Sequence, residues 1–169
     1  ITAPPPSPWV TRFADMAPSA CTVLDLAAGS GRHTSWFLNA GHSVVAIDRD
    51  ISWLKNLEGQ KNLAVLAANL ETAQLPINTS RTQFGCVVVT NYLHRPLLSS
   101  IVGAVAEGGV LLYETFAQGN ERFGHPRNPL YLLAPGELLA AVAGELTVTA
   151  YEHGEVARDG SSAVVQRIA

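Results

Sequence analysis

The segment VLDLAAGSGRH, residues 23–33, constrains the fold of this chain more than any other feature. An apolar run containing Asp25 turns through Gly29 and Gly31 into a helical pattern. This order predicts a strand, a turn whose backbone can approach a ligand closely, and a helix that aims free N–H groups at that ligand. The next apolar run, SVVAI, ends at a second acid, Asp48. Because an ionised carboxylate only accepts hydrogen bonds, Asp48 is placed to hold both hydroxyls of a ribose, which predicts a nucleoside cofactor site.

Apolar runs and helical patterns alternate along the chain, which favours parallel strands covered on both faces. We expect strands at 22–26, 43–47, 63–67, 84–90, 109–115, 145–152 and 162–168. We expect helices at 30–40, 50–58, 95–106 and 135–143, three of them capped by Gly41, Gly59 and Gly108. The short segment HGEVARDGS joins the last two strands and favours an antiparallel hairpin. The expected fold is an α/β, seven-stranded, doubly wound sheet.

One domain over residues 1–169 is expected, since domains average roughly 150 residues. Residues 1–16 form an N-terminal extension that includes the helical segment WVTRFADM. This helix has no sheet position of its own, and two placements are open. It folds over the cofactor mouth, bringing Trp9, Arg12 and Phe13 to the ligand, or it covers an edge of the sheet.

Two observations separate the cofactor classes that use such a glycine turn. The dinucleotide pattern has a third glycine where this chain has Thr34, which disfavours an NAD-dependent oxidoreductase. Asp25 would repel a diphosphate and attract a cation. The sequence Asp25-Leu26-Ala27-Ala28-Gly29-Ser30-Gly31 resembles the first motif, acid-x-G-x-G-x-G, of class I S-adenosylmethionine (SAM)-dependent methyltransferases, with Ala27 in place of the first glycine.

The resemblance implies a Rossmann-like sheet of order 3-2-1-4-5-7-6, with SAM as cofactor and S-adenosylhomocysteine (SAH) as product. The family usually has an acid that accepts from the adenine amino group where this chain has Asn69, and an Asn that only shapes a loop is the equal alternative. Leu70 would offer its backbone N–H to the purine. The cofactor contacts implied by the resemblance are Asp25, Ala27, Gly29, Gly31, Asp48, Arg49, Asn69, Leu70 and Asn91.

The segment TNYLHRP, residues 90–96, follows the fourth expected strand, where open α/β sheets bind their ligands. Asn91 would hold the ammonium of the methionine part, and the three side chains after it would face the transferred methyl. His94 is the first candidate for a general base and Tyr92 the second. Structural alternatives are that His94 caps a helix, that Tyr92 is a half-buried strand residue, and that Arg95 pairs with an acid such as Glu114.

The connection from residue 116 to residue 134 is long for a compact domain, and such loops are usually lids or binding loops. YLHRPL, the YETF strand end and FGHPRNPLYLLAPGEL are similar to small bacterial methyltransferases grouped with tellurite-resistance proteins. We expect substrate contacts from Arg12, Arg95 and Glu114.

Composition bears on partners and location. A net charge of −3 without a Lys/Arg cluster disfavours nucleic acid as a partner, and a small-molecule acceptor is expected. No apolar stretch is long enough to span a bilayer and no leader opens the chain, so a cytoplasmic protein is expected. His33, His94 and His125 lack ligand spacing, so no metal site is expected.

The function expected is methyl transfer from SAM to a small molecule by in-line displacement. The alternatives are a non-catalytic SAM- or nucleotide-binding module, and a methyltransferase that modifies RNA or protein with a partner. The sequence leaves the oligomeric state and the identity of the acceptor open.

Overall fold

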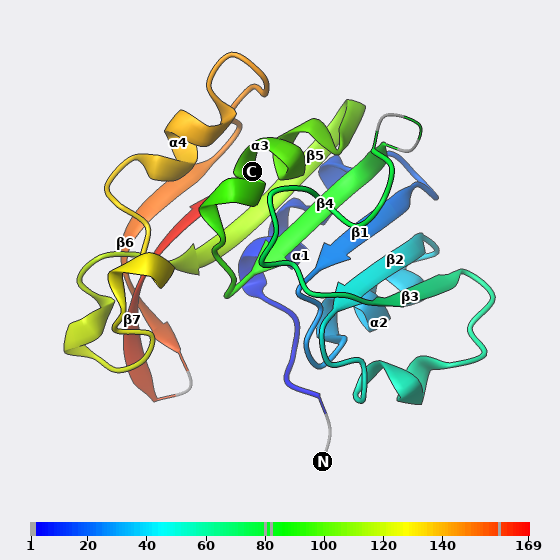
Figure 1. The fold of residues 1–169 in the computed structure, drawn as a ribbon, viewed down its shortest axis with the longest axis horizontal. Coiled ribbons are helices and arrows are strands. Elements are labelled where there is room, and N and C mark those ends of the chain that lie inside the picture. The colour runs from blue at the N-terminus through cyan, green and yellow to red at the C-terminus, as the bar shows by residue number, and fades with distance from the viewer. Residues whose placement is uncertain (1–2, 80, 82, 159) are drawn as a thin grey trace.

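The computed structural model describes residues 3–79, 81, 83–158 and 160–169. Its centre is a seven-stranded sheet of order β3-β2-β1-β4-β5-β7-β6, which confirms the expected fold (Figure 1). All neighbouring strands pair in parallel except β5 with β7 and β6 with β7. The strands are β1 (Thr22–Leu26), β2 (Ser43–Asp48), β3 (Leu63–Ala67), β4 (Phe84–Thr90), β5 (Val105–Phe116), β6 (Tyr151–Arg158) and β7 (Ser161–Ile168).

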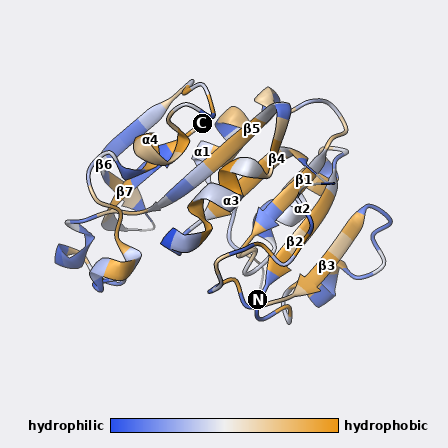
Figure 2. Ribbon diagram, turned by 45° about the horizontal axis from the view of Figure 1, so that its top comes forward, coloured by the Kyte–Doolittle hydropathy of each residue, from blue (hydrophilic) through white to orange (hydrophobic). Residues whose placement is uncertain are grey.

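Helices cover both faces of the sheet. They are α1 (Pro8–Phe13), α2 (Arg32–Asn39), α3 (Leu98–Gly103) and α4 (Glu137–Val142), with 3₁₀ helices η1 (Ala14–Met16), η2 (Leu54–Leu57), η3 (Arg95–Leu97), η4 (Asn120–Arg122) and η5 (Pro129–Tyr131). One core cluster joins α3 and α4 to the sheet, and a second joins α1, α2 and η2 to its other face. The central strands are accordingly hydrophobic on both faces (Figure 2), as in β4, where six consecutive residues are buried.

The expected elements differ from the structure at two helices and at one expected helix cap. Only η2 forms within 50–58, and 95–106 divides into η3 and α3. Gly108 lies inside β5, where the register with β4 shifts, and so is not a helix cap. A Cβ on Gly109 would lie 2.9 Å from the Ala106 carbonyl oxygen and 3.0 Å from that of Gly85, so this bulge requires glycine.

The C-terminal hairpin is present, but its turn is shorter than expected. The segment HGEVARDGS is mostly strand, because β6 runs to Arg158 and pairs with β7 through Ser161; residue 159 lies outside the described residues. Residues 145–150, expected as strand, precede β6. β6 lies at the edge of the sheet, and its residues are half-buried or exposed. Polar residues can therefore form part of this strand. The hairpin brings Arg158 and Arg167 beside the end of β5.

No described helix is both long enough and apolar enough to cross a membrane.

Candidate active site

A cavity of about 1070 Å³ lies at the carboxyl ends of β1, β2, β4 and β5. β1 and β4 are neighbours whose crossovers leave on opposite faces, which is where open α/β sheets bind ligands. Of the sequence-predicted site residues, the structure brings nine to this cavity: Ala27, Gly29, Asp48, Arg49, Asn69, Leu70, Asn91, Tyr92 and Glu114. Five are placed elsewhere: Asp25, Gly31, Arg12, His94 and Arg95.

The glycine turn has one face open to the cavity. Ala27 and Gly29 both have positive φ, at 53° and 54°, and a Cβ on Gly29 would meet only the Ala27 carbonyl oxygen, 3.9 Å away. A ligand can therefore approach the Gly29 backbone closely. Gly31 has a different role from the one expected, because a Cβ there would lie 2.7 Å from Leu54. Its missing side chain lets α2 pack on η2.

Asp48 lies at the cavity wall in a fixed orientation. Its Oδ2 accepts a 2.8 Å hydrogen bond from the Gly29 N–H, and its Oδ1 accepts a 2.9 Å bond from the Asp50 N–H. Each carboxylate oxygen can accept a second bond. The carboxylate therefore joins β2 to the glycine turn and can still accept from two hydroxyls of a ligand.

Asp25 lies beneath the turn, not in the cavity. It is buried, and its Oδ2 accepts a 2.6 Å hydrogen bond from the Thr34 hydroxyl. The threonine at the third glycine position thus links β1 to α2. Burial raises the pKa of Asp25 to about 6, against the lowering effect of the Thr34 hydrogen bond.

We expect Asp25→Asn to change how stability depends on pH. Because the folded-state pKa lies above the ordinary 3.8, folding takes up a proton, and this contribution to stability is lost as pH rises from about 4 to 6. The asparagine does not titrate. As pH rises from about 4 to 6, the free energy of unfolding of the variant should therefore increase by up to ~3 kcal/mol relative to that of wild type. Urea denaturation at pH 4, 5, 6 and 7 measures the difference. A difference independent of pH would contradict the burial effect.

Asn69 and Leu70 follow β3 at the purine end predicted by the resemblance. Asn69 is exposed, and its Oδ1 accepts a 2.9 Å bond from the Glu71 N–H. This is the loop-shaping role considered as the alternative. The same oxygen keeps a second lone pair. Leu70 is buried and supplies an apolar wall.

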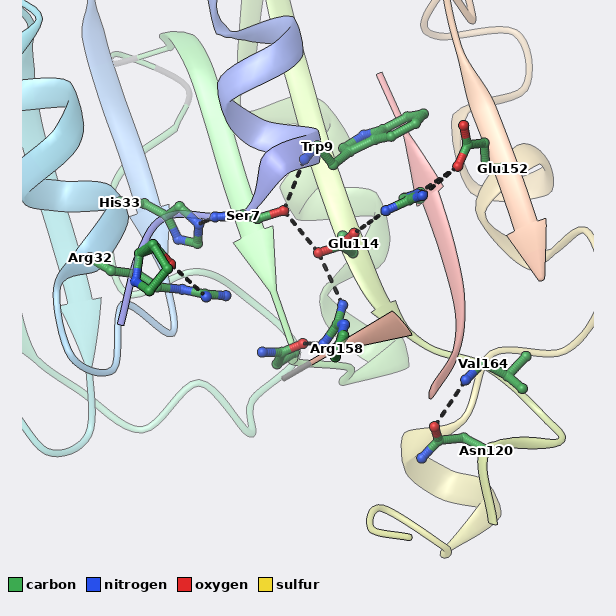
Figure 3. Close-up of polar contacts among 12 residues, drawn as sticks. Ser7, Trp9, Arg32, His33, Glu114, Asn120, Glu152, Arg158 and Val164 are labelled. Carbon is green, nitrogen blue, oxygen red and sulfur yellow. Dashed lines mark hydrogen bonds and ion pairs between the residues drawn. The ribbon is translucent and has the colours of Figure 1, made fainter. Parts of the chain in front are cut away.

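Glu114 is the centre of a charged network at the other end of the cavity (Figure 3). Its buried carboxylate accepts a 3.0 Å bond from the Ser7 hydroxyl and forms ion pairs of 3.1 Å with Arg158 and 3.2 Å with Arg167. Arg167 also pairs with Glu152 at 2.6 Å. Glu114, an expected substrate contact, lines the cavity and also orients two arginines that line it.

Residues 4–8, which we call the strap, form another wall of the cavity. Ser7 fixes the strap, because its N–H donates to Nε2 of His33 at 3.0 Å and its hydroxyl to Glu114. Burial lowers the pKa of His33 to about 3, so the ring stays neutral and accepts this bond. In Figure 1 the strap runs along the edge where β1 and β4 end.

Two placements were considered for the N-terminal helix, over the cofactor mouth or over the sheet. In the structure this helix, α1, covers the sheet. Trp9 is buried against the sheet, and its Nε1 donates to the Ile168 carbonyl at 3.1 Å. Arg12 lies over the Phe13 ring, and neither residue lines the cavity. The strap, not the helix, reaches the ligand site.

Arg95 holds the loop between β5 and α4. Its Nε and Nη2 bond both carboxylate oxygens of Glu137 at 2.6 and 3.0 Å, and its remaining donors bond the carbonyls of Leu130 and Leu132. These bonds use four of the five N–H donors of the guanidinium, Arg95 lies outside the cavity lining, and its acid partner is Glu137 rather than Glu114. His94 precedes η3, and its side chain makes no capping bond.

Asn91 and Tyr92 directly follow β4 and line the cavity. Asn91 has φ 55°, and its side-chain oxygen accepts a 2.9 Å bond from Arg158. Burial raises the pKa of Tyr92 to about 12, with Glu71 adding to the rise. Tyr92 therefore stays protonated near neutral pH, in the form that donates a hydrogen bond.

The sequence analysis missed Ser7, Arg158 and Arg167. Arg158 was assigned to a turn, whereas it ends β6, and Arg167 lies in the expected last strand. No spacing links these residues, since Ser7 and Glu114 are 107 residues apart. Within the described part of the chain, no group of three His, Cys, Asp or Glu side chains is placed to hold a metal ion.

The model of the family described as tellurite resistance protein TehB matches residues 13–109. This stretch is more than half of the chain and includes the glycine turn, Asp48 and the end of β4. The chain belongs to the TehB family. Among curated proteins, none matches the chain significantly.

Solved structures share the fold. TehB from Haemophilus influenzae has a TM-score of 0.71 at 17% identity, over 95% of this chain and 59% of that protein. This member of the TehB family thus spans less than two thirds of that relative. The N-methyltransferase NodS from Bradyrhizobium japonicum WM9 has a TM-score of 0.69 at 16% identity, covering 94% of this chain and 92% of that one. The glycopeptide N-methyltransferase MtfA in complex with SAM has a TM-score of 0.62 at 20% identity, covering 94% and 92%.

Proposed function

We propose that the chain is a SAM-dependent methyltransferase that acts on a small molecule. The observation that carries the proposal is the Asp48 carboxylate, fixed 2.8 Å from the Gly29 N–H beside a turn that a ligand can approach. That arrangement suits a nucleoside with a free ribose diol. The complexes of MtfA with SAM and SAH support the choice of cofactor.

The residues present fit this cofactor. The cavity is at least as large as ordinary small-molecule sites, which are about 300–1,000 Å³. Asp48 would accept from the ribose hydroxyls, with Asn69 and Leu70 beside the purine. Arg49 directly follows Asp48, and Asn91 lines the cavity and accepts a hydrogen bond from Arg158.

The acceptor would bind at the end lined by Glu114, Arg158 and Arg167. Arg158 and Arg167 share Glu114, and Arg167 also pairs with Glu152, so the charges of this network balance. Both guanidinium groups line the cavity and can donate further hydrogen bonds to a small acceptor that carries oxygen or negative charge. The strap and the β5–α4 loop, through Pro126 and Tyr131, would enclose it.

The side chains of the protein need to contribute little covalent chemistry to this reaction. A bound SAM supplies an activated methyl group on sulfonium. Positioning an acceptor in line with that group can supply about 7–11 kcal/mol of the barrier. The described residues that line the cavity include no histidine, and Tyr92 is protonated near neutral pH. We infer that the acceptor arrives as a nucleophile, such as a soft anion, that needs no base.

A methyl-transfer screen tests the proposal. Labelled SAM is offered with small thiols, chalcogen oxyanions, phenols and amines, and separately with total RNA and a protein extract. We expect label in a small anionic acceptor. Label only in RNA or only in protein would contradict the small-molecule acceptor and favour a methyltransferase that works with a partner. The same screen with His94→Ala should show full turnover.

A further inference from the structure

Tyr92 carries a polar group that the fold does not satisfy. Its hydroxyl is buried and has no hydrogen-bond partner among the described residues. A buried hydroxyl without a partner costs folding free energy, which a phenylalanine of the same shape would avoid. An acceptor supplied by a ligand would recover that free energy.

Tyr92 lines the cavity together with Asp48, Arg49 and Glu71. These three residues lie at or just after the ends of β2 and β3, which the proposed function assigns to the nucleoside. Glu114 and its two arginines occupy the opposite end.

The Tyr92 backbone is held in place. The buried Tyr113 hydroxyl donates a 2.8 Å hydrogen bond to the Tyr92 carbonyl, and the Tyr92 ring packs on the core cluster of α3 and α4. These contacts restrict the Tyr92 ring, so little ordering entropy is lost when its hydroxyl donates to a ligand.

We propose that the Tyr92 hydroxyl donates a hydrogen bond to the nucleoside part of the bound cofactor. This inference rests on the proposed function and assigns Tyr92 a binding role in place of a catalytic one. The acceptor on the ligand is a purine nitrogen or a ribose oxygen, since both lie in the part of the cofactor held by Asp48.

The test compares two ligands and two variants by calorimetry and thermal unfolding. SAH contains the nucleoside and the amino acid, whereas 5′-methylthioadenosine contains the nucleoside only. Tyr92→Phe should weaken both ligands by about 3- to 10-fold, the effect of one hydrogen bond. The Tm of the ligand-free Tyr92→Phe protein should equal or exceed that of wild type.

Tyr151→Phe is the matched control. Its hydroxyl donates a 3.0 Å bond to Gln166 and lies outside the cavity lining. We expect a lower Tm and unchanged affinity for both ligands. The two tyrosines should therefore respond in opposite ways to the same substitution.

Three outcomes would overturn the inference. Equal affinities of Tyr92→Phe and wild type would remove the hydrogen bond. A loss for SAH alone would move the contact to the amino-acid end. A wild-type chain that binds neither ligand would overturn the proposed function and this inference together, whereas the first two outcomes leave the proposed function standing.

Discussion

We expect Asp48→Ala to lower the affinity of the chain for SAH by about 10- to 100-fold, through loss of two charge-assisted hydrogen bonds. The variant also removes the acceptor of the Gly29 N–H, 2.8 Å away, and so loosens the turn that the ligand approaches. Calorimetric titration with SAH measures the change.

Asp50→Ala is the control for this prediction. Asp50 lies in the same loop and is exposed, and its Oδ1 accepts from the Ser52 N–H, outside the cavity lining. Its affinity for SAH should match that of wild type. Equal affinities of wild type and Asp48→Ala would show that the ribose is held elsewhere.

The second large effect is expected at Glu114. Glu114→Ala removes the carboxylate shared by Arg158, Arg167 and Ser7 and leaves two guanidinium groups without their common partner. Breaking a buried pair in this way costs about 3–5 kcal/mol. A loss of this size should lower the Tm of a chain of this length by roughly 6–20 °C.

Glu152→Ala separates burial from charge in this network. Glu152 also pairs with Arg167, at 2.6 Å, but nearly half of its side chain is exposed. Exposed pairs contribute at most about 1 kcal/mol. The Tm should therefore fall far less than in Glu114→Ala. Equal losses in the two variants would show that Glu114 does not hold the strap and the hairpin together.

The cofactor end of the site could be predicted from sequence because its elements are consecutive. β1, the glycine turn, α2 and β2 form one local unit, and Asp48 joins it through a single hydrogen bond. Apolar runs likewise predicted six of the seven strands, whereas β6 lies mostly in the segment expected as a turn. Within the helix expected at 50–58, only the 3₁₀ helix η2 forms. Leu54 and Leu57 nevertheless lie beside Gly31, and this contact requires their side chains but not a longer helix.

The acceptor end could not be predicted in the same way. Ser7, Glu114, Arg158 and Arg167 come from the strap, β5 and the hairpin, and only the sheet order brings them together. For His94 and Arg95, closeness in sequence to the end of β4 was misleading. η3 begins at Arg95, and its side chain bonds the β5–α4 loop. Neither residue lines the cavity.

Calorimetric titration of the purified protein with SAM, SAH and NAD tests the central claim most directly. The Asp48 carboxylate at an open glycine turn, without a phosphate-binding third glycine, predicts that SAM and SAH bind at one site per chain and that NAD does not bind. Binding of NAD with no binding of SAM or SAH would contradict the account.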